Sequence, residues 1–319
     1  MYMNKSLLLV FILLFAGPAM ADDCPPAGID MTLKRVSEHV YFVQGISGVA
    51  TDNEGFISNA GVIVTGAGIV IFDTLGTPAL SRMLLEKIRM ITDEPVVRVI
   101  VSHYHADHVY GLQTFEDLDA EILAPAGSEK YLASDSARER LEERRFTLDP
   151  WVNDSTRLVF PDQYLSEGMQ FRLGDVEFVI TVVGNAHSDG DLTLFVEPDR
   201  VLFSGDIIFE GRIPFLGDSN TRRWVRILER MEKEQLVALV PGHGGVAEKP
   251  NEAISLTRRY LEYLREKMGE AVDEFVPFSE AYEEISWSNF DHLTAFEEAN
   301  RRNAYQVYLS MEAEMLAGQ

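Results

Sequence analysis

Short runs of β-branched and aromatic residues alternate with Gly-containing turns early in the chain. The runs at 40–43, 60–64 and 69–72 are rich in Val, Ile and Phe and predict the strands of a meander. Residues 78–90 then carry apolar side chains at helical spacing, and 96–101 is a Val- and Ile-rich run typical of a buried strand. A strand, a helix and another strand in this order predict a layered α/β domain.

A second half of the chain repeats this pattern, with no fixed-period repeat and no low-complexity linker. Between the halves, residues 127–146 are helical in pattern and heavily charged, as in a solvated or lid-like helix. The elements predicted for the second half are strands at 170–173, 176–183, 192–196 and 201–203, a helix around 221–233 and a strand at 237–240.

From residue 250 onward the pattern is mostly helical. The clearest helical stretches are 258–267 and 293–315, and Pro277 breaks the pattern between them. We therefore expect a main domain at 22–250 and a C-terminal helical extension at 251–319 that packs on it. The alternative is that the extension forms an independent partner-binding domain.

Residues 1–21 have the pattern of an export signal. Lys5 precedes an apolar run at 7–15, and Ala19-Met20-Ala21 is a small-x-small cleavage site. The apolar run is short for a hydrocarbon layer of roughly 30 Å, which makes an uncleaved membrane anchor the weaker alternative. We expect a mature periplasmic or secreted protein without stable membrane insertion.

The composition is that of a folded, strongly acidic protein. Acidic residues number 51 and basic residues 28, giving a formal charge of -23, while 46% of residues are hydrophobic. This apolar content excludes disorder for most of the chain. Nucleic acid is not an expected partner, because the acidic surface repels phosphates and no basic cluster is interleaved with aromatic residues.

Cys24 is the only cysteine, so an intramolecular disulfide is excluded. Its place near the expected mature N-terminus is typical of a lipid anchor. However, the preceding Asp22-Asp23 departs from the small, apolar residues of lipoprotein signals. We therefore expect an unmodified thiol.

Histidines concentrate in polar segments that follow β-rich runs. Three of them lie within six positions, in the run His103-Tyr104-His105-Ala106-Asp107-His108. His and Asp supply the nitrogen and oxygen ligands of zinc. His103 and His105 are two apart, so in an extended segment both rings project to one side, and Asp107 and His108 follow in the turn. One loop can thus serve two metals.

Three further candidate ligands lie far downstream: His187, Asp206 and His243. Small residues surround each of them, as in Ala186-His187-Ser188, Gly205-Asp206 and Gly242-His243-Gly244. Small neighbours allow the backbone to approach a metal closely.

Together these residues resemble the metallo-β-lactamase superfamily of metallohydrolases, which has the HxHxDH run and the later His, Asp and His in the same order. The resemblance implies a four-layer αββα sandwich with its site along one edge of the paired sheets. It also implies two zinc ions per chain, with iron or manganese as alternatives. The implied ligands are His103, His105 and His187 for the first metal, Asp107, His108 and His243 for the second, and Asp206 as a bridge between them.

The residue at 206 narrows the range of superfamily branches that this chain resembles. Members that cleave β-lactams generally carry Cys or Ser there, whereas the hydroxyacylglutathione hydrolase and lactonase branches keep Asp. The segments 43–45, 59–61, 205–215 and 302–305 further resemble the exported zinc metallohydrolases of the quinoprotein relay system and their SoxH-like relatives. That group is associated with periplasmic oxidation of alcohols or sulfur compounds, which implies a partner from such a system.

The expected activity is hydrolysis of a small-molecule ester, thioester, lactone or lactam by a metal-bridging hydroxide. Asp107 is the expected catalytic residue, orienting the nucleophile and carrying a proton. Tyr104 and Asn185 are expected to donate to an oxyanion, and Arg212 to bind a substrate carboxylate. Two alternatives remain: a mononuclear iron enzyme resembling persulfide dioxygenases, and a non-catalytic partner of a periplasmic oxidation system.

Overall fold

The computed structural model describes residues 24–217, 219–232 and 235–318. The expected export signal at 1–21 lies outside these residues. Within them, no helix combines the length and the apolar character that crossing a membrane requires.

The first sheet has seven strands in the order β1-β2-β3-β4-β5-β6-β7. Neighbouring strands are antiparallel from β1 to β4 and parallel from β4 to β7. The strands are β1 (Leu33–Arg35), β2 (Val40–Val43), β3 (Ala60–Val64), β4 (Ile69–Phe72), β5 (Val96–Ile100), β6 (Glu121–Pro125) and β7 (Gln163–Leu165).

The second sheet has five strands in the order β12-β11-β10-β9-β8. Only the β11 and β12 pair is parallel. The strands are β8 (Met169–Leu173), β9 (Val176–Gly184), β10 (Asp191–Glu197), β11 (Val201–Phe209) and β12 (Ala238–His243).

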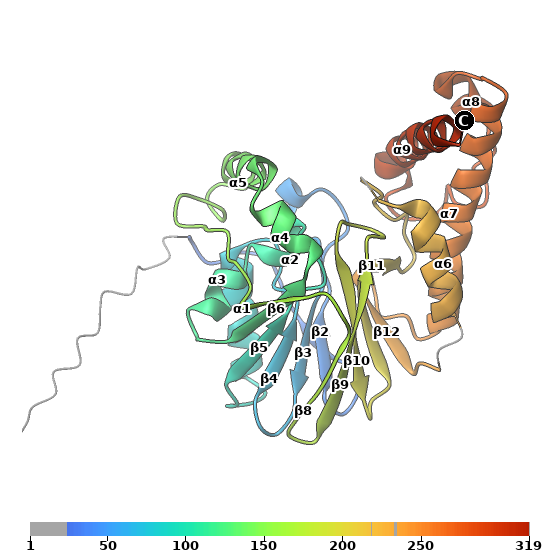
Figure 1. Cartoon of the computed structure of the whole chain (residues 1–319). Helices are drawn as coiled ribbons and strands as arrows, with labels where there is room; N and C mark the ends of the chain where they lie inside the picture. Colours follow the sequence, from blue (N-terminus) through green and yellow to red (C-terminus); the bar gives the residue numbers. More distant parts are fainter. Residues whose placement is uncertain (1–23, 218, 233–234, 319) are drawn as a thin grey trace, which may run out of the picture.

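The two sheets pack face to face, and helices cover their outer faces (Figure 1). Phe42, Phe72, Phe178 and Phe203 are among the buried side chains between the sheets. The first sheet is covered by α1 (Pro78–Arg89), α2 (Ala106–Val109), α3 (Leu112–Glu116), α4 (Gly127–Leu132) and α5 (Asp135–Thr147), and the second by α6 (Thr221–Met231) and α7 (Pro250–Asp273). The predicted αββα sandwich is confirmed.

The helical region after residue 250 is continuous with the outer layer of the second sheet. Helix α7 packs against α6 and β11, and it is joined by α8 (Phe278–Glu284) and α9 (Phe296–Ala317). One apolar cluster connects Phe209 and Trp224 of the sandwich to Tyr260 and Val307 of the extension. The extension is therefore packed on the domain rather than separated from it.

Several element boundaries differ from the sequence prediction. Strand β11 was expected to end at Phe203, but it continues to Phe209 and contains Asp206. Its pairing with β12 is irregular around Gly205, where φ is +50°, so a Ser-Gly-Asp sequence that predicts a loop is instead a kink inside the strand. The predicted helix at 127–146 is two helices, because the Ser134 hydroxyl caps α5 at the Ala137 amide.

Candidate metal centre

Seven His and Asp side chains meet at one end of the sandwich. Residues 103–108 follow β5 directly and enter α2, and His187 lies in the loop between β9 and β10. Asp206 is inside β11, and His243 is the last residue of β12. The residues form two groups whose potential ligand atoms lie within 4.8 Å of one another: His103, His105, His187 and Asp206 in one, and Asp107, His108 and His243 in the other.

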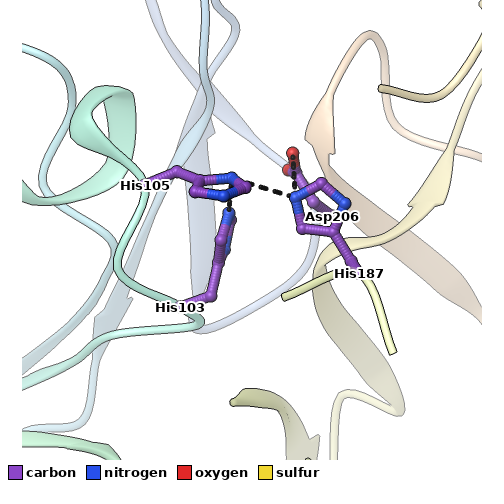
Figure 2. A group of neighbouring side chains, drawn as sticks. All are labelled: His103, His105, His187 and Asp206. Carbon is purple, nitrogen blue, oxygen red and sulfur yellow. Dashed lines mark hydrogen bonds and ion pairs between the residues drawn. The ribbon is translucent and has the colours of Figure 1, made fainter. Parts of the chain in front are cut away.

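In the first group the ring nitrogens point toward a common centre (Figure 2). His105 Nδ1 lies 2.9 Å from His103 Nε2 and 3.1 Å from His187 Nε2. An Asp206 carboxylate oxygen lies 3.4 Å from His187 Nε2. Three imidazoles and one carboxylate thus present their lone pairs to the same small space.

The second group shares Asp206 with the first. The Asp206 carboxylate lies 3.3 Å from His108 Nε2 and 3.3 Å from His243 Nε2. Asp107 completes the group, with Oδ2 3.5 Å from His108 Nε2 and 3.3 Å from His243 Nε2. Asp206 therefore lies between the two groups and contacts histidines of both.

The donor atoms fit divalent metal ions. His108 Nε2 and one carboxylate oxygen of Asp206 are buried and have no hydrogen-bond partner among the described residues. Buried polar atoms without partners are costly unless something else satisfies them. Imidazole nitrogens and carboxylate oxygens are ligands of zinc and iron alike, so the donors alone do not select the metal.

Comparison with known proteins identifies the family. The model of the metallo-beta-lactamase superfamily matches residues 53–243, which is more than half of the chain and includes all seven side chains. The chain belongs to the metallo-beta-lactamase superfamily. It is a metal-dependent hydrolase of that superfamily, and its His and Asp cluster can hold metal.

Similar superfamily members include proteins named for different substrates. Metallo-beta-lactamase IND-1 of Chryseobacterium indologenes is 22% identical over 246 residues, covering 76% of this chain and 92% of that protein. The acyl-coenzyme A thioesterase MBLAC2 of Gallus gallus is 30% identical over 157 residues, covering 45% of this chain and 55% of that protein.

Solved structures share the fold. The sec-alkylsulfatase Pisa1 from Pseudomonas sp. superposes with a TM-score of 0.70 at 17% identity, over 87% of this chain and 50% of that one. A metallo-beta-lactamase from Pontibacter korlensis superposes with a TM-score of 0.58 at 18% identity, over 73% of this chain and 99% of that one.

Residues outside the superfamily motif hold the histidines in place. Asp73 follows β4 and is fully buried, and its carboxylate lies 2.9 Å from His108 Nδ1. The same carboxylate accepts hydrogen bonds of 2.7 Å from the amide and the hydroxyl of Ser102, whose oxygen is 2.9 Å from His103 Nδ1. Such partners orient the ring so that the other nitrogen faces the metal. Asp73 was not predicted from the sequence, although an acid directly after a buried strand is a usable signal.

Two further loops are fixed in the same way. His243 Nδ1 lies 2.7 Å from the Ile57 carbonyl oxygen, which leaves Nε2 directed inward. The loop that carries His187 wraps around Asp191, whose carboxylate accepts from the amides of Ala186 and Ser188 at 3.0 Å. Hydrogen bonds within the protein thus fix the orientation of these candidate ligands.

Glycine is required at two places in the centre. A Cβ on Gly242 would lie 2.0 Å from Oδ1 of Asp206, so no larger residue fits without moving that carboxylate. At Gly205 two features require glycine. Its φ is positive, and a Cβ there would lie 2.6 Å from the Cβ of Ser102. The small residues in the motif thus bring β11, β12 and the 102–108 loop together.

Burial and charge divide the histidines into two kinds. Burial, assisted by neighbouring histidines, lowers the pKa of His103 far below its usual range and that of His187 to about 3. Burial also lowers the pKa of His243, but Asp206 and Asp107 outweigh it and raise that pKa to about 9. The pKa of His108 is also lowered by burial, but neighbouring carboxylates, chiefly that of Asp107, outweigh this effect and raise it well above its usual value. The carboxylates thus favour the charged form of His108 and His243, whereas burial favours the neutral form of His103 and His187.

The two carboxylates stay ionised. Burial favours the protonated forms, but His108 and His243 outweigh it, and the pKa values of Asp107 and Asp206 are both lowered. Asp107 and Asp206 thus offer ionised oxygens, the form in which a carboxylate binds a metal ion.

The three expected substrate contacts have different surroundings. The Tyr104 hydroxyl donates to the Val159 carbonyl at 2.8 Å, so its hydrogen is already engaged. Asn185 donates to Asp189 at 3.1 Å, and its own carbonyl oxygen is buried without a hydrogen-bond partner among the described residues. The side chain of Arg212 is close enough to Asp206 and Asp107 for their charges to act on it.

Proposed function

We propose that this superfamily member is a binuclear zinc hydrolase that cleaves the bond between the carbonyl carbon and the leaving oxygen, sulfur or nitrogen of a small ester, thioester, lactone or lactam. The observation that carries the proposal is the position of Asp206, whose carboxylate contacts His187 of the first group and His108 and His243 of the second. A carboxylate between two complete sets of ligands is suited to bridging two ions.

The proposed ligands are the seven side chains of the two groups. His103, His105 and His187 would hold one ion, Asp107, His108 and His243 the other, and Asp206 both. When bound, the ions would supply a water of lowered pKa and a Lewis acid for the carbonyl oxygen. A nucleophilic Ser or Cys is then not needed.

Asp107 is the proposed proton carrier. Its side chain is 22% exposed, whereas those of His108 and Asp206 are 0% and 4% exposed. It is therefore the carboxylate of the second group that water or a leaving group can reach. Its lowered pKa keeps it ionised at neutral pH. We propose that it orients the attacking water and relays a proton from that water to the leaving group.

Esters and thioesters are the favoured substrates within this range. The name of the MBLAC2 relative, an acyl-coenzyme A thioesterase, supports thioester cleavage. Superfamily members that cleave β-lactams generally carry Cys or Ser at the position of Asp206. The Asp at this position therefore disfavours lactams as substrates. We also propose that Arg212 contacts the substrate from the side of Asp107, since its Nε is buried and lacks a hydrogen-bond partner among the described residues.

We further propose that the protein is exported and belongs with the quinoprotein relay and SoxH-like metallohydrolases. The support is the signal pattern in residues 1–21 and the segments 205–215 and 302–305. Its partner would be a component of a periplasmic oxidation system. Intact mass of protein from its native host tests the export: a chain that begins at Asp22 is expected, and a diacylated chain that begins at Cys24 contradicts it.

Metal content and a substrate panel test the hydrolase proposal. Purified protein should contain close to two zinc ions per chain, and ester or thioester cleavage should rise with pH through one apparent pKa near 7. Chelation should abolish the activity, and added zinc should restore it. One tightly held iron per chain would instead favour the persulfide dioxygenase-like alternative, and a zinc-loaded protein that cleaves nothing would favour the binding partner.

A further inference from the structure

A cavity of about 490 Å³ opens beside the first group of candidate ligands. His105 and His187 form part of its wall. The remaining wall comes from α4, α5, the 188–190 loop, the segment at 215–217 and helix α9. A cavity of this size accommodates a small organic molecule, and its position allows one end of that molecule to reach the metal centre.

The side chains around this cavity are unusually basic for so acidic a protein. The whole chain carries a formal charge of -23, yet Lys130, Arg140 and Arg302 line the cavity, and Asp189 is the only acidic residue among the described residues of the lining. A local excess of positive charge on an acidic surface concentrates anions at that place.

Two of these cations are not held in ion pairs within the described part of the chain. Among the ion pairs of the described residues, none involves Lys130 or Arg302. The Arg302 guanidinium lies over the ring of Phe215, 5.0 Å from its centroid. Arg140 pairs with Glu143 through Nη1 at 2.6 Å, which leaves its other N–H groups for a ligand.

The cavity also holds a buried polar group without a partner. Ser128 of α4 lines the cavity and is 3% exposed, and its hydroxyl has no hydrogen-bond partner among the described residues. A buried hydroxyl normally pairs with protein, water or ligand.

We propose that this cavity binds the negatively charged end of the substrate, with Arg140 of α5 and Arg302 of α9 as the main specificity-determining residues and Lys130 as a third cation. The inference rests on the proposed hydrolase function and narrows it to esters or thioesters that carry a carboxylate or another oxyanion away from the scissile bond. Guanidinium groups suit this role because their planar N–H donors match the oxygens of such groups.

The test uses two substrates that differ in one charge. The adipate half-ester of 4-nitrophenol carries a free carboxylate, and methyl 4-nitrophenyl adipate has the same scissile bond without it. The zinc-loaded full chain should show a higher kcat/KM for the anionic ester. Arg140→Gln and Arg302→Gln should each reduce this preference about three- to tenfold, mainly by raising KM for the anionic ester. The expected factor is modest because both side chains are exposed and solvent screens part of their charge.

Arg138→Gln is the matched control. Arg138 lies on the same helix as Arg140, is largely exposed and pairs with Asp135, but it does not line the cavity. This variant should keep the wild-type preference. If Arg140→Gln and Arg302→Gln also keep it while both esters are cleaved, the anion pocket is wrong and the hydrolase proposal stands.

If the wild type cleaves neither ester, that result counts against the proposed hydrolase function. A binding measurement then tests the anion pocket separately. Adipamic acid and adipamide differ in the same single charge and have no ester to cleave. Calorimetry should show tighter binding of the acid to the zinc-loaded wild type and to Arg138→Gln, and loss of that difference in the two pocket variants. Equal affinities for acid and amide in the wild type would overturn the inference.

Discussion

Asp206 is the residue on which the two groups of ligands depend. It contacts His187 on one side and His108 and His243 on the other, and Gly242 leaves it the necessary space. Its role also explains why the motif surrounds it with small residues.

Replacing Asp206 should separate the two metals. In Asp206→Ala the first group keeps three neutral imidazoles, whereas the second keeps two histidines and the more exposed Asp107. We expect the variant to retain about one metal per chain after dialysis, against about two in the wild type, as measured by elemental analysis. Asp175→Ala, on the exposed β8–β9 turn, is the control. Equal loss of both metals, or loss of neither, would argue against a bridging Asp206.

At the residue scale, the sequence predicted the side chains that the structure brings together in the candidate centre, but not the side chains that hold them in place. The His and Asp motifs are compact and chemically distinctive, so their convergence could be inferred. Asp73 and Asp191 act through hydrogen bonds to residues that only the fold brings near, for example His108 Nδ1. Arg140 and Arg302 lie 162 positions apart and share a cavity only because α5 and α9 flank it.

At the scale of elements, the strands with long Val- and Ile-rich runs were predicted, and the short ones were missed. Strands β1, β6 and β7 have the sequences LKR, EILAP and QYL, which lack a sustained alternation of apolar and polar residues. Their pairing with neighbouring strands, rather than their own sequence, makes them strands. Tertiary context therefore decides both edge strands of the first sheet, β1 and β7, and also β6 beside β7.

A buried polar contact ties the two sheets together at the end opposite the metal centre. His39 immediately precedes β2, and its amide and Nδ1 lie 3.1 and 2.7 Å from the carboxylate of Asp199, in the turn between β10 and β11. Burial raises the pKa of Asp199, but the donors around it, His39 among them, outweigh this effect and lower it. The ionised carboxylate therefore stabilises the folded sandwich.

Asp199→Asn should lower the free energy of unfolding by about 1 kcal/mol at pH 7. Because the folded-state pKa of Asp199 is lowered, its contribution is present above the ordinary carboxyl pKa of about 3.9 and is lost as the pH falls through the lower folded-state value. The difference between wild type and variant should thus be constant from pH 7 to 5 and shrink below about pH 4. Urea unfolding with chelator present measures it, and a difference that grows in acid would contradict the assignment.

Asp291→Asn is the control for this measurement. Asp291 also neighbours a histidine, but it is 55% exposed and lies 3.9 Å from His292. Since exposed pairs of this kind contribute little, this variant should unfold like the wild type at every pH.

At the scale of the whole molecule, the helical extension belongs to the folded unit. Trp224 and Leu228 of α6 are fully buried, and they share one apolar cluster with Tyr260, Leu261 and Leu264 of α7. Asn303 of α9 also reaches the metal side, where its amide nitrogen donates to the Pro214 carbonyl at 2.6 Å and its oxygen accepts from the Leu216 amide at 3.2 Å. The extension thus positions the segment that borders the cavity.

A chain that ends at Lys249 should therefore aggregate or lose most activity. Removing α7–α9 uncovers Trp224, Leu228 and their neighbours, and each such side chain contributes about 1.5–3 kcal/mol when buried. Size-exclusion chromatography and ester hydrolysis measure the outcome. A chain that ends at Leu316 keeps the buried positions of α9 and should behave like the full chain. A monomeric chain ending at Lys249 with two metals and wild-type turnover would show that the extension is an independent module.

The contribution of α9 to the cavity has a consequence for how this protein can diverge. All candidate metal ligands lie between His103 and His243, inside the part that the superfamily model matches, whereas Arg302 lies outside it. The proposed pocket thus draws one cation, Arg302, from a stretch of the chain separate from the candidate ligands, while Arg140 lies in the same stretch as they do. Substitutions in the last helix could therefore alter the binding of the substrate's far end while every candidate ligand stays unchanged.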